Sequence, residues 1–125
     1  MARIMIVDDS PTLRASAQFT LESEGHAVIQ AENGATALST LDGLSKDEAG
    51  DLKMIITDIN MPEMDGITFI RKVKQTQFRY VPVLVLTTES QDAMKSEGRE
   101  AGAAGWLVKP FKPEQLNDVV QRFVT

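Results

Sequence analysis

Short apolar runs alternate along this chain with longer segments whose apolar residues recur at helical spacing, the last of them beginning at Pro113. The runs are rich in β-branched or large aliphatic residues and lie at about residues 3–7, 26–31, 53–57, 82–87 and 105–108. Alternation of short buried strands with helices is typical of a parallel sheet covered by helices on both faces. The pattern therefore predicts an α/β fold, a (βα)5 doubly wound three-layer sandwich.

Helix boundary signals support this alternation. Ser10 and Pro11 supply an N-cap followed by a proline at the first helical position, and Gly25 fits the end of the same helix. Thr88 and Gln91 have the spacing of a capping box for the fourth helix. These signals place helices between the apolar runs, as a doubly wound fold requires.

Residues 42–51 are polar and contain two glycines. We interpret this segment as a helix end followed by a long loop. No linker, internal repeat or low-complexity tract divides the 125 residues. Because a chain of this length can bury a core as one unit, we expect a single domain over residues 1–125, with no output domain.

The overall composition excludes several classes of protein. Apolar residues make up 42% of the chain, which is ordinary for a globular protein and argues against disorder. A net charge of -5 argues against nucleic acid as the main partner, because that partner needs a clustered basic surface. The absence of cysteine excludes disulfides and thiolate metal sites. With no signal peptide and no apolar stretch of about 20 residues, we expect a cytoplasmic protein without membrane insertion.

Carboxylates follow the first and third apolar runs. Asp8 and Asp9 come directly after the first run, and Asp58 closes the third. In open α/β sheets, ligands bind beyond the carboxyl ends of the strands, where the strand order reverses. In a sheet of order 2-1-3-4-5 that point lies between strands 1 and 3. The assumed topology and the acids therefore indicate the same crevice.

Three carboxylates in one crevice repel one another. A close pair at about 4 Å costs roughly 4 kcal/mol at an effective dielectric near 20. Either one acid is protonated or a cation neutralises the set. Oxygen donors without nearby histidine or cysteine favour a hard divalent ion, and Mg²⁺ suits a site with few protein ligands. The alternative is an acidic loop edge solvated by water, which would require acids from two strand ends to converge by coincidence.

The fourth and fifth runs add a hydroxyl and a cation, because Thr87 closes one and Lys109 follows the other. Each alone would be an ordinary strand or surface residue. Together with the acids they supply what phosphoryl transfer requires, which is positioning and charge neutralisation around the phosphoryl oxygens. A carboxylate can be the nucleophile, since aspartyl phosphates are a known class of covalent intermediate.

Four spaced motifs resemble the receiver domains of two-component response regulators, and most of all the stand-alone chemotaxis type, the CheY-like receivers. The motifs are VDDS at residues 7–10, DINMPEMDG at 58–66, LTTE at 86–89 and GWLVKPF at 105–111. The resemblance covers essentially the whole chain. It implies a flavodoxin-like sheet of order 2-1-3-4-5 and a single-domain signalling protein rather than an enzyme with a separate substrate.

The resemblance implies that Asp58 accepts a phosphoryl group from a sensor histidine kinase or a histidine phosphotransfer protein. Thr87 and Lys109 would contact the phosphoryl group. Thr87 and the aromatic residue of strand 5, here Trp106, would form a coupled switch that remodels the face built from helix 4, strand 5 and helix 5. A monomer would then bind a downstream protein, with the flagellar motor switch as one candidate, or serve as a phosphate sink.

The resemblance also implies a magnesium site. Asp9 and Asp58 would bind Mg²⁺ directly, and Asp8 would act mostly through water. Asn60 would contribute its backbone carbonyl. In this family the Lys–Pro peptide bond after strand 5, here Lys109–Pro110, is usually cis.

Two aromatic residues depart from a simple pattern. Trp106 stands where the family usually has Tyr or Phe, and a bulkier ring turns inward less readily. Phe19 falls off the apolar stripe of the first helix, so one interpretation is an exposed aromatic that anchors a partner. We favour the other interpretation, in which Phe19 packs at the helix edge.

Three other functions compete with this interpretation. A Mg²⁺-dependent phosphatase with an aspartate nucleophile would place a second acid two residues later, where this chain has Asn60. A flavin-binding electron carrier would need a hydroxyl- and glycine-rich phosphate loop after strand 1, where Asp8 and Asp9 would repel a phosphate. A pseudo-receiver would bind proteins without being phosphorylated. It would not need the full set of three acids, one hydroxyl and one lysine that this chain has: Asp8, Asp9, Asp58, Thr87 and Lys109.

Overall fold

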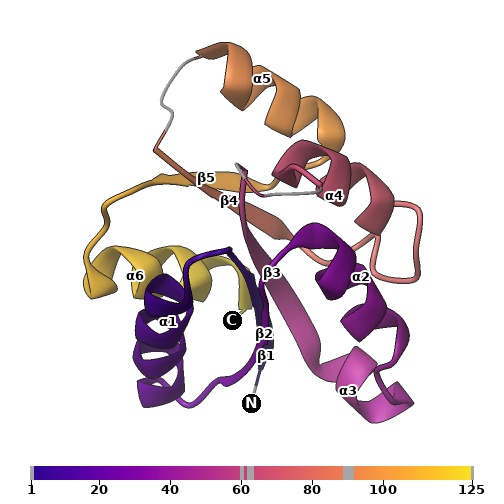
Figure 1. Cartoon of the computed structure of the whole chain (residues 1–125). Coiled ribbons are helices and arrows are strands. Elements are labelled where there is room, and N and C mark those ends of the chain that lie inside the picture. Colours follow the sequence, from indigo (N-terminus) through magenta and orange to yellow (C-terminus); the bar gives the residue numbers. More distant parts are fainter. Residues whose placement is uncertain (1, 60, 62–63, 89–91, 125) are drawn as a thin grey trace.

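The computed structural model of the chain describes residues 2–59, 61, 64–88 and 92–124. Within these residues, five parallel strands form one sheet in the order β2-β1-β3-β4-β5 (Figure 1). The strands are β1 (Arg3–Val7), β2 (Ala27–Ala31), β3 (Leu52–Asp58), β4 (Val83–Thr87) and β5 (Gly105–Val108). The structure confirms the predicted α/β class and the strand order.

Helices cover both faces of the sheet (Figure 1). One face carries α1 (Pro11–Ser23) and α6 (Pro113–Val124). The other carries α2 (Gly34–Asp42), α4 (Gly66–Val73) and α5 (Asp92–Ala101). The short helix α3 (Lys46–Asp51) directly precedes β3. Because α3 adds one helix to the predicted set, the expected helices 4 and 5 are α5 and α6.

The apolar runs are continuous because their strands are buried on both faces. Along β1, Met5 and Val7 belong to the core beneath α2, α4 and α5, whereas Ile4 and Ile6 belong to the core beneath α1 and α6. All four side chains are fully buried. Burial of each such side chain stabilises the fold by about 1.5–3 kcal/mol. This two-sided core holds the strand ends, and therefore the site, in fixed positions.

The expected boundaries of α1 and α6 are confirmed. The Ser10 side chain accepts a hydrogen bond of 3.2 Å from the backbone N–H of Leu13, and Pro11 is the first helical residue. Gly25 follows the end of α1 with φ of +88°, a left-handed conformation that favours glycine. Helix α6 begins at Pro113. The capping box expected from Thr88 and Gln91 involves a residue outside the described ranges.

The long loop expected over residues 42–51 is wrong. Helix α2 ends at Asp42, and after a short connection α3 occupies residues 46–51. The Ser45 hydroxyl accepts a 3.2 Å hydrogen bond from the Glu48 N–H, and the Glu48 carboxylate accepts a 3.0 Å hydrogen bond from the Ser45 N–H. This reciprocal capping box gives a polar segment enough stability to form a helical turn. Helix α3 leads into the amino end of β3, at the opposite end of that strand from Asp58.

Among the described residues, no helix has the length and apolar character needed to span a membrane.

Candidate functional site

Strand register brings the acids together at one edge of the sheet. Val7 of β1 pairs with Thr57 of β3, and each is followed at once by an aspartate, Asp8 or Asp58. On the other side of β3, Asp58 pairs with Leu86, so Thr87 lies one residue further along β4. The predicted crevice between strands 1 and 3 is thus the place where these strand ends meet.

Asp8, Asp9 and Asp58 form a cluster in which one carboxylate oxygen of each lies within 4.8 Å of the others. Asp8 is fully buried, Asp58 is 6% exposed, and Asp9 is exposed. A solvated loop edge would leave all three acids in water. Burial of two of them instead requires partners that compensate their charge.

The buried carboxylates have such partners. The Asp8 Oδ1 atom accepts a 2.9 Å hydrogen bond from the Ser10 N–H, and Asp58 Oδ1 accepts one of 2.8 Å from the Ile59 N–H. The Lys109 ammonium lies 2.8 Å from Asp8 Oδ2 and 3.4 Å from Asp58 Oδ2. Lys109 therefore bridges the two buried acids.

Opposing effects act on the pKa of Lys109. Partial burial of the ammonium disfavours its charge and lowers the pKa, which is the largest single effect. The hydrogen bond to Asp8 and the charges of Asp8 and Asp58 act in the other direction and together outweigh burial. The pKa of Lys109 is consequently raised, and its positive charge is secure at neutral pH.

Thr87 and the following strand complete the edge. Thr87 is fully buried, and its backbone carbonyl accepts a 2.8 Å hydrogen bond from the Lys109 N–H. The Lys109–Pro110 peptide bond is cis, as the family resemblance implies. Trp106 is half-buried and packs against the core beneath α2, α4 and α5.

Two residues that support the site were not singled out from the sequence. A Cβ atom on Gly66 would lie against the carbonyl oxygen of Asp58 and 2.7 Å from the Cα of Ile59. Only glycine therefore allows the start of α4 to approach the backbone of Asp58 and Ile59 this closely. The Gly66 N–H donates a 2.8 Å hydrogen bond to the Ile59 carbonyl, which ties the helix to the strand end. The Asp-Gly pair at the end of the second motif was the available signal.

Arg14 is the second such residue. Its Nη1 atom donates a 2.6 Å hydrogen bond to the backbone carbonyl of Asp8, and its Nε atom donates one of 2.9 Å to Gln30 on β2. The guanidinium thus fixes the backbone at the acidic strand end from the side of α1. A basic residue on an exposed helix surface carries no pattern that distinguishes this role.

Two expectations have other outcomes. Asn60 lies outside the described residues, so the role of its backbone carbonyl stays a prediction. Phe19 is 76% exposed, so the expected packing at the helix edge is wrong.

The donor chemistry of the cluster fits a hard divalent cation. Three carboxylates gather here, and the Lys109 ammonium contacts two of them, Asp8 and Asp58. Carboxylate oxygens are the ligands that such ions prefer. Asp9, the exposed member, lies on the solvent side, from which a hydrated ion would enter. The cluster can therefore hold a metal ion.

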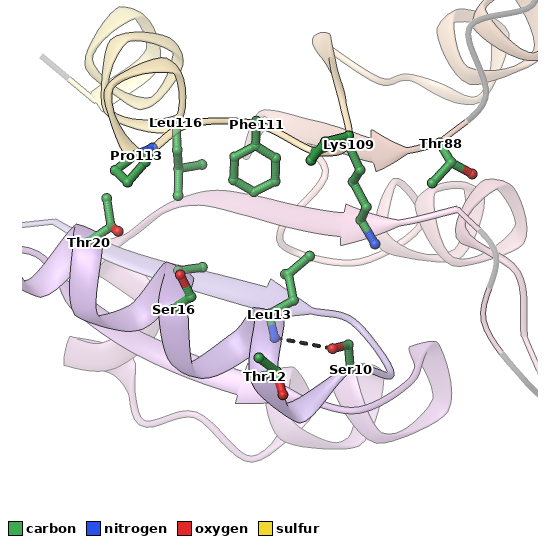
Figure 2. Close-up of a pocket in the computed structure, with 12 residues that line it drawn as sticks. Ser10, Thr12, Leu13, Ser16, Thr20, Thr88, Lys109, Phe111, Pro113 and Leu116 are labelled. Atoms are coloured by element: carbon green, nitrogen blue, oxygen red, sulfur yellow. Dashed lines mark hydrogen bonds between the residues drawn. The ribbon is translucent and has the colours of Figure 1, made fainter.

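A cavity of about 530 Å³ adjoins the site between α1 and the segment that leads into α6. Figure 2 shows Leu13 and Ser16 on one side facing Phe111 and Leu116 on the other, with Lys109 at one end. The cavity is lined by Ser10, Thr12, Leu13, Ser16, Ala17, Thr20, Thr88, Lys109, Pro110, Phe111, Pro113 and Leu116. Its walls are mostly apolar, and Lys109 both lines the cavity and contacts two acids of the cluster.

Comparison with known proteins identifies the family. Residues 4–121 match the family described as the response regulator receiver domain. The chain belongs to this family. It is 36% identical over 121 residues to chemotaxis protein CheY1 of Helicobacter pylori, covering 95% of this chain and 94% of that relative.

Solved receiver structures agree with this membership. Chemotaxis protein CheY4 of Vibrio cholerae superimposes with a TM-score of 0.89 at 40% identity, covering 98% of each chain. The receiver domain of the sensor histidine kinase PA1611 from Pseudomonas aeruginosa has a magnesium ion coordinated in its active site cleft. It superimposes with a TM-score of 0.85 at 25% identity, covering 98% of this chain and 97% of that one. The chain is thus a CheY-like receiver, a class of phosphoacceptor signalling modules.

Proposed function

We propose that residues 1–125 form a single-domain response regulator that accepts a phosphoryl group on Asp58. The donor is a sensor histidine kinase or a histidine phosphotransfer protein. The observation that carries the proposal is the placement of Asp58, at the end of the central strand β3, with Lys109 3.4 Å away and Asp8 and Asp9 in the same cluster. Receiver-family membership supports the same assignment.

The covalent step needs little from the protein beyond position and charge. An oxygen of the Asp58 carboxylate attacks the phosphorus of a phosphohistidine, the P–N bond breaks, and the imidazole departs with the bonding pair. The Ile59 N–H and Gly66 hold the strand end so that the carboxylate is oriented before the donor arrives. The raised pKa of Lys109 keeps an ammonium beside the developing phosphoryl charge.

Mg²⁺ is the cation we assign to the cluster. Asp9 and Asp58 would bind it directly, Asp8 mostly through water, and Asn60 through its backbone carbonyl. When bound, the ion supplies positive charge next to the phosphoryl oxygens. The magnesium seen in the PA1611 receiver supports this choice.

Phosphorylation would be transmitted through the Lys109 ion pairs. The phosphoryl group adds roughly two negative charges and three acceptor oxygens. Lys109 and Thr87 would turn toward these oxygens, and Lys109 would loosen its 2.8 Å contact with Asp8. Thr87 and Trp106 would then shift a pre-existing equilibrium of the face built from α5, β5 and α6.

The partners follow from the two faces next to the site. The phosphodonor would approach along α1, where the mostly apolar cavity reaches Lys109 and where Phe19 is exposed. The α5-β5-α6 face would bind a downstream protein in chemotaxis-type signalling, and the flagellar motor switch is one candidate. The similarity to CheY1 and CheY4 supports this output. A monomeric state and a cytoplasmic location stay predictions.

The decisive experiment uses acetyl phosphate as a small phosphodonor. Wild-type protein with Mg²⁺ should gain the mass of one phosphoryl group, and the fluorescence of Trp106, the single tryptophan, should change at the same time. Asp58→Asn should show neither effect. Retained labelling in that variant would refute Asp58 as the acceptor, and no labelling of the wild type would favour a pseudo-receiver.

A further inference from the structure

The indole of Trp106 lies against a glycine in the middle of α5. A Cβ atom built on Gly98 would stand 2.5 Å from Cζ3 of Trp106 and 3.4 Å from both Cε3 and Cη2. Real Cβ atoms essentially never approach another heavy atom as closely as 2.5 Å. Gly98 is buried although its sequence neighbours Glu97 and Arg99 are exposed. The ring of Trp106 contributes to this burial, because it occupies the position that a side chain would take.

The helix itself gives no reason for a glycine here. Gly98 is internal to α5 (Asp92–Ala101), where glycine is unfavourable relative to alanine because it loses more conformational freedom on folding. Among the described residues, the glycines with positive φ are Gly25 and Gly102, so the backbone of Gly98 is one that alanine also adopts. The requirement for glycine therefore comes from the space that Trp106 fills.

We propose that Gly98 is a positioning residue for Trp106, a member of the proposed Thr87–Trp106 switch. Because Gly98 has no side chain, α5 leaves a space that the Trp106 indole occupies, and we call this space the seat of the indole. The larger ring on β5 and the smallest residue on α5 form one complementary pair. The sequence-based expectation considered ring size alone when it held that a tryptophan turns inward less readily. In the structure, the position of the Trp106 ring depends also on the space that Gly98 leaves. The role in signalling rests on the proposed function, whereas the seat itself exists in the unphosphorylated protein.

A displaced ring also has a place to go. A second cavity of about 320 Å³ adjoins Trp106 and is lined by Arg99, Ala103, Ala104 and Gly105 in addition to the tryptophan. A methyl group at position 98 would force the indole to move, and this cavity offers space beside it. The change would alter the α5-β5 surface without requiring the sheet to unfold.

Three variants test the pairing: Gly98→Ala, Trp106→Phe and the double variant. All three contacted carbons belong to the second ring of the indole, which phenylalanine lacks. Gly98→Ala alone should lower Tm, and in the Trp106→Phe background the same change should raise Tm, because only the helix preference for alanine remains. This reversal of sign is what a general defect in α5 would not produce.

Fluorescence supplies an independent readout. In Gly98→Ala the emission of Trp106 should move to longer wavelength and acrylamide should quench it more strongly, with no Mg²⁺ or phosphodonor present. If Gly98→Ala does not fold but the double variant does, the clash is supported as well. An unchanged emission with a raised Tm, or an equal loss of Tm in both backgrounds, would overturn the proposal.

The same variants separate this inference from the proposed function. Labelling with acetyl phosphate, followed by intact mass, should be retained in Gly98→Ala, while the fluorescence change on labelling should be at least halved. Absence of labelling in the wild type would refute the proposed function but not the contact between Gly98 and Trp106, which exists in the unphosphorylated protein. A full wild-type fluorescence change in labelled Gly98→Ala would refute the role of Gly98 in the switch.

Discussion

At both ends of the sheet, carboxylates accept hydrogen bonds from backbone N–H groups, but at one end the carboxylates are buried and at the other they lie at the surface. At the carboxyl end, Asp8 and Asp58 accept hydrogen bonds from nearby backbone N–H groups while almost fully buried. At the amino end, Ser45 and Glu48 cap α3 with similar bonds at the protein surface. Burial makes the difference, because a buried carboxylate must retain its charge partners whereas a solvated one can exchange them for water.

The two ends differ also in how far apart in the chain their partners lie. The capping residues are 3 positions apart, but Lys109 and Asp8 are 101 positions apart. The capping box forms as soon as one helical turn forms. The ion pair exists only when the whole sheet is assembled. The surface end is therefore stabilised locally, whereas the buried end, where we propose that phosphorylation takes place, depends on the whole fold.

The largest expected effect comes from removing the acceptor. Asp58→Asn should abolish phosphoryl labelling, because an amide is not a nucleophile at neutral pH, and should leave the fold intact because Lys109 keeps its 2.8 Å contact with Asp8. Labelling is measured by intact mass, and folding by circular dichroism. Loss of the fold in this variant would show that the Asp58 charge is needed to hold the carboxyl end together.

Gly66→Ala should be the most destabilising single change among those expected to retain the acceptor. The added methyl group would press on the backbone of Asp58 and Ile59, which cannot move without disturbing β3. We expect a loss of about 2–4 kcal/mol in the free energy of unfolding, measured by urea denaturation. Gly50→Ala on α3 is the matched control, since a Cβ there has no heavy atom within 4 Å. Equal effects at both glycines would contradict the contrast between the two ends.

Replacing Lys109 should reveal the charge balance of the site. Lys109→Met leaves Asp8 and Asp58 without their shared cation, and the unfolding free energy should fall by about 1–3 kcal/mol in metal-free buffer. Mg²⁺ should recover part of this loss, because it compensates the same carboxylates. Phosphoryl labelling should remain possible, with a weaker change in Trp106 fluorescence. If Lys109→Met is as stable as the wild type without Mg²⁺, the ion pairs of Lys109 with Asp8 and Asp58 do not stabilise the fold.

The smallest effect is expected at the surface cap. The backbone hydrogen bond from Ser45, then the hydroxyl, lower the pKa of Glu48 below its usual value of 4.5. A lowered folded-state pKa means that the stabilisation is present above pH 4.5 and is lost as the pH falls through the folded-state value. The urea midpoint of wild type should therefore exceed that of Glu48→Gln at pH 7, and the difference should shrink below pH 4.5. Glu32→Gln, at an exposed position outside any helix, is the control.

Much of this molecule could be predicted from the sequence because its main signals are local. Each strand is a short apolar run, and acids of the cluster stand at the ends of such runs, as Asp8 and Asp58 do. Once the strand order is assumed, the convergence of these acids follows from topology alone. The short helix α3 was also encoded locally, by Ser45 and Glu48, and was missed because the polar composition of the segment suggested a loop.

What the sequence by itself determined is the set of strands, their order by family resemblance, and the acids, hydroxyl and lysine at their carboxyl ends. Only the tertiary structure decided which of these groups contact one another and which other residues hold them in place. It shows Lys109 bridging Asp8 and Asp58, Arg14 holding the Asp8 carbonyl, and Gly98 seating Trp106. The physical reason is that a strand or a cap is specified by neighbours along the chain, whereas these contacts depend on distances between segments that only packing sets.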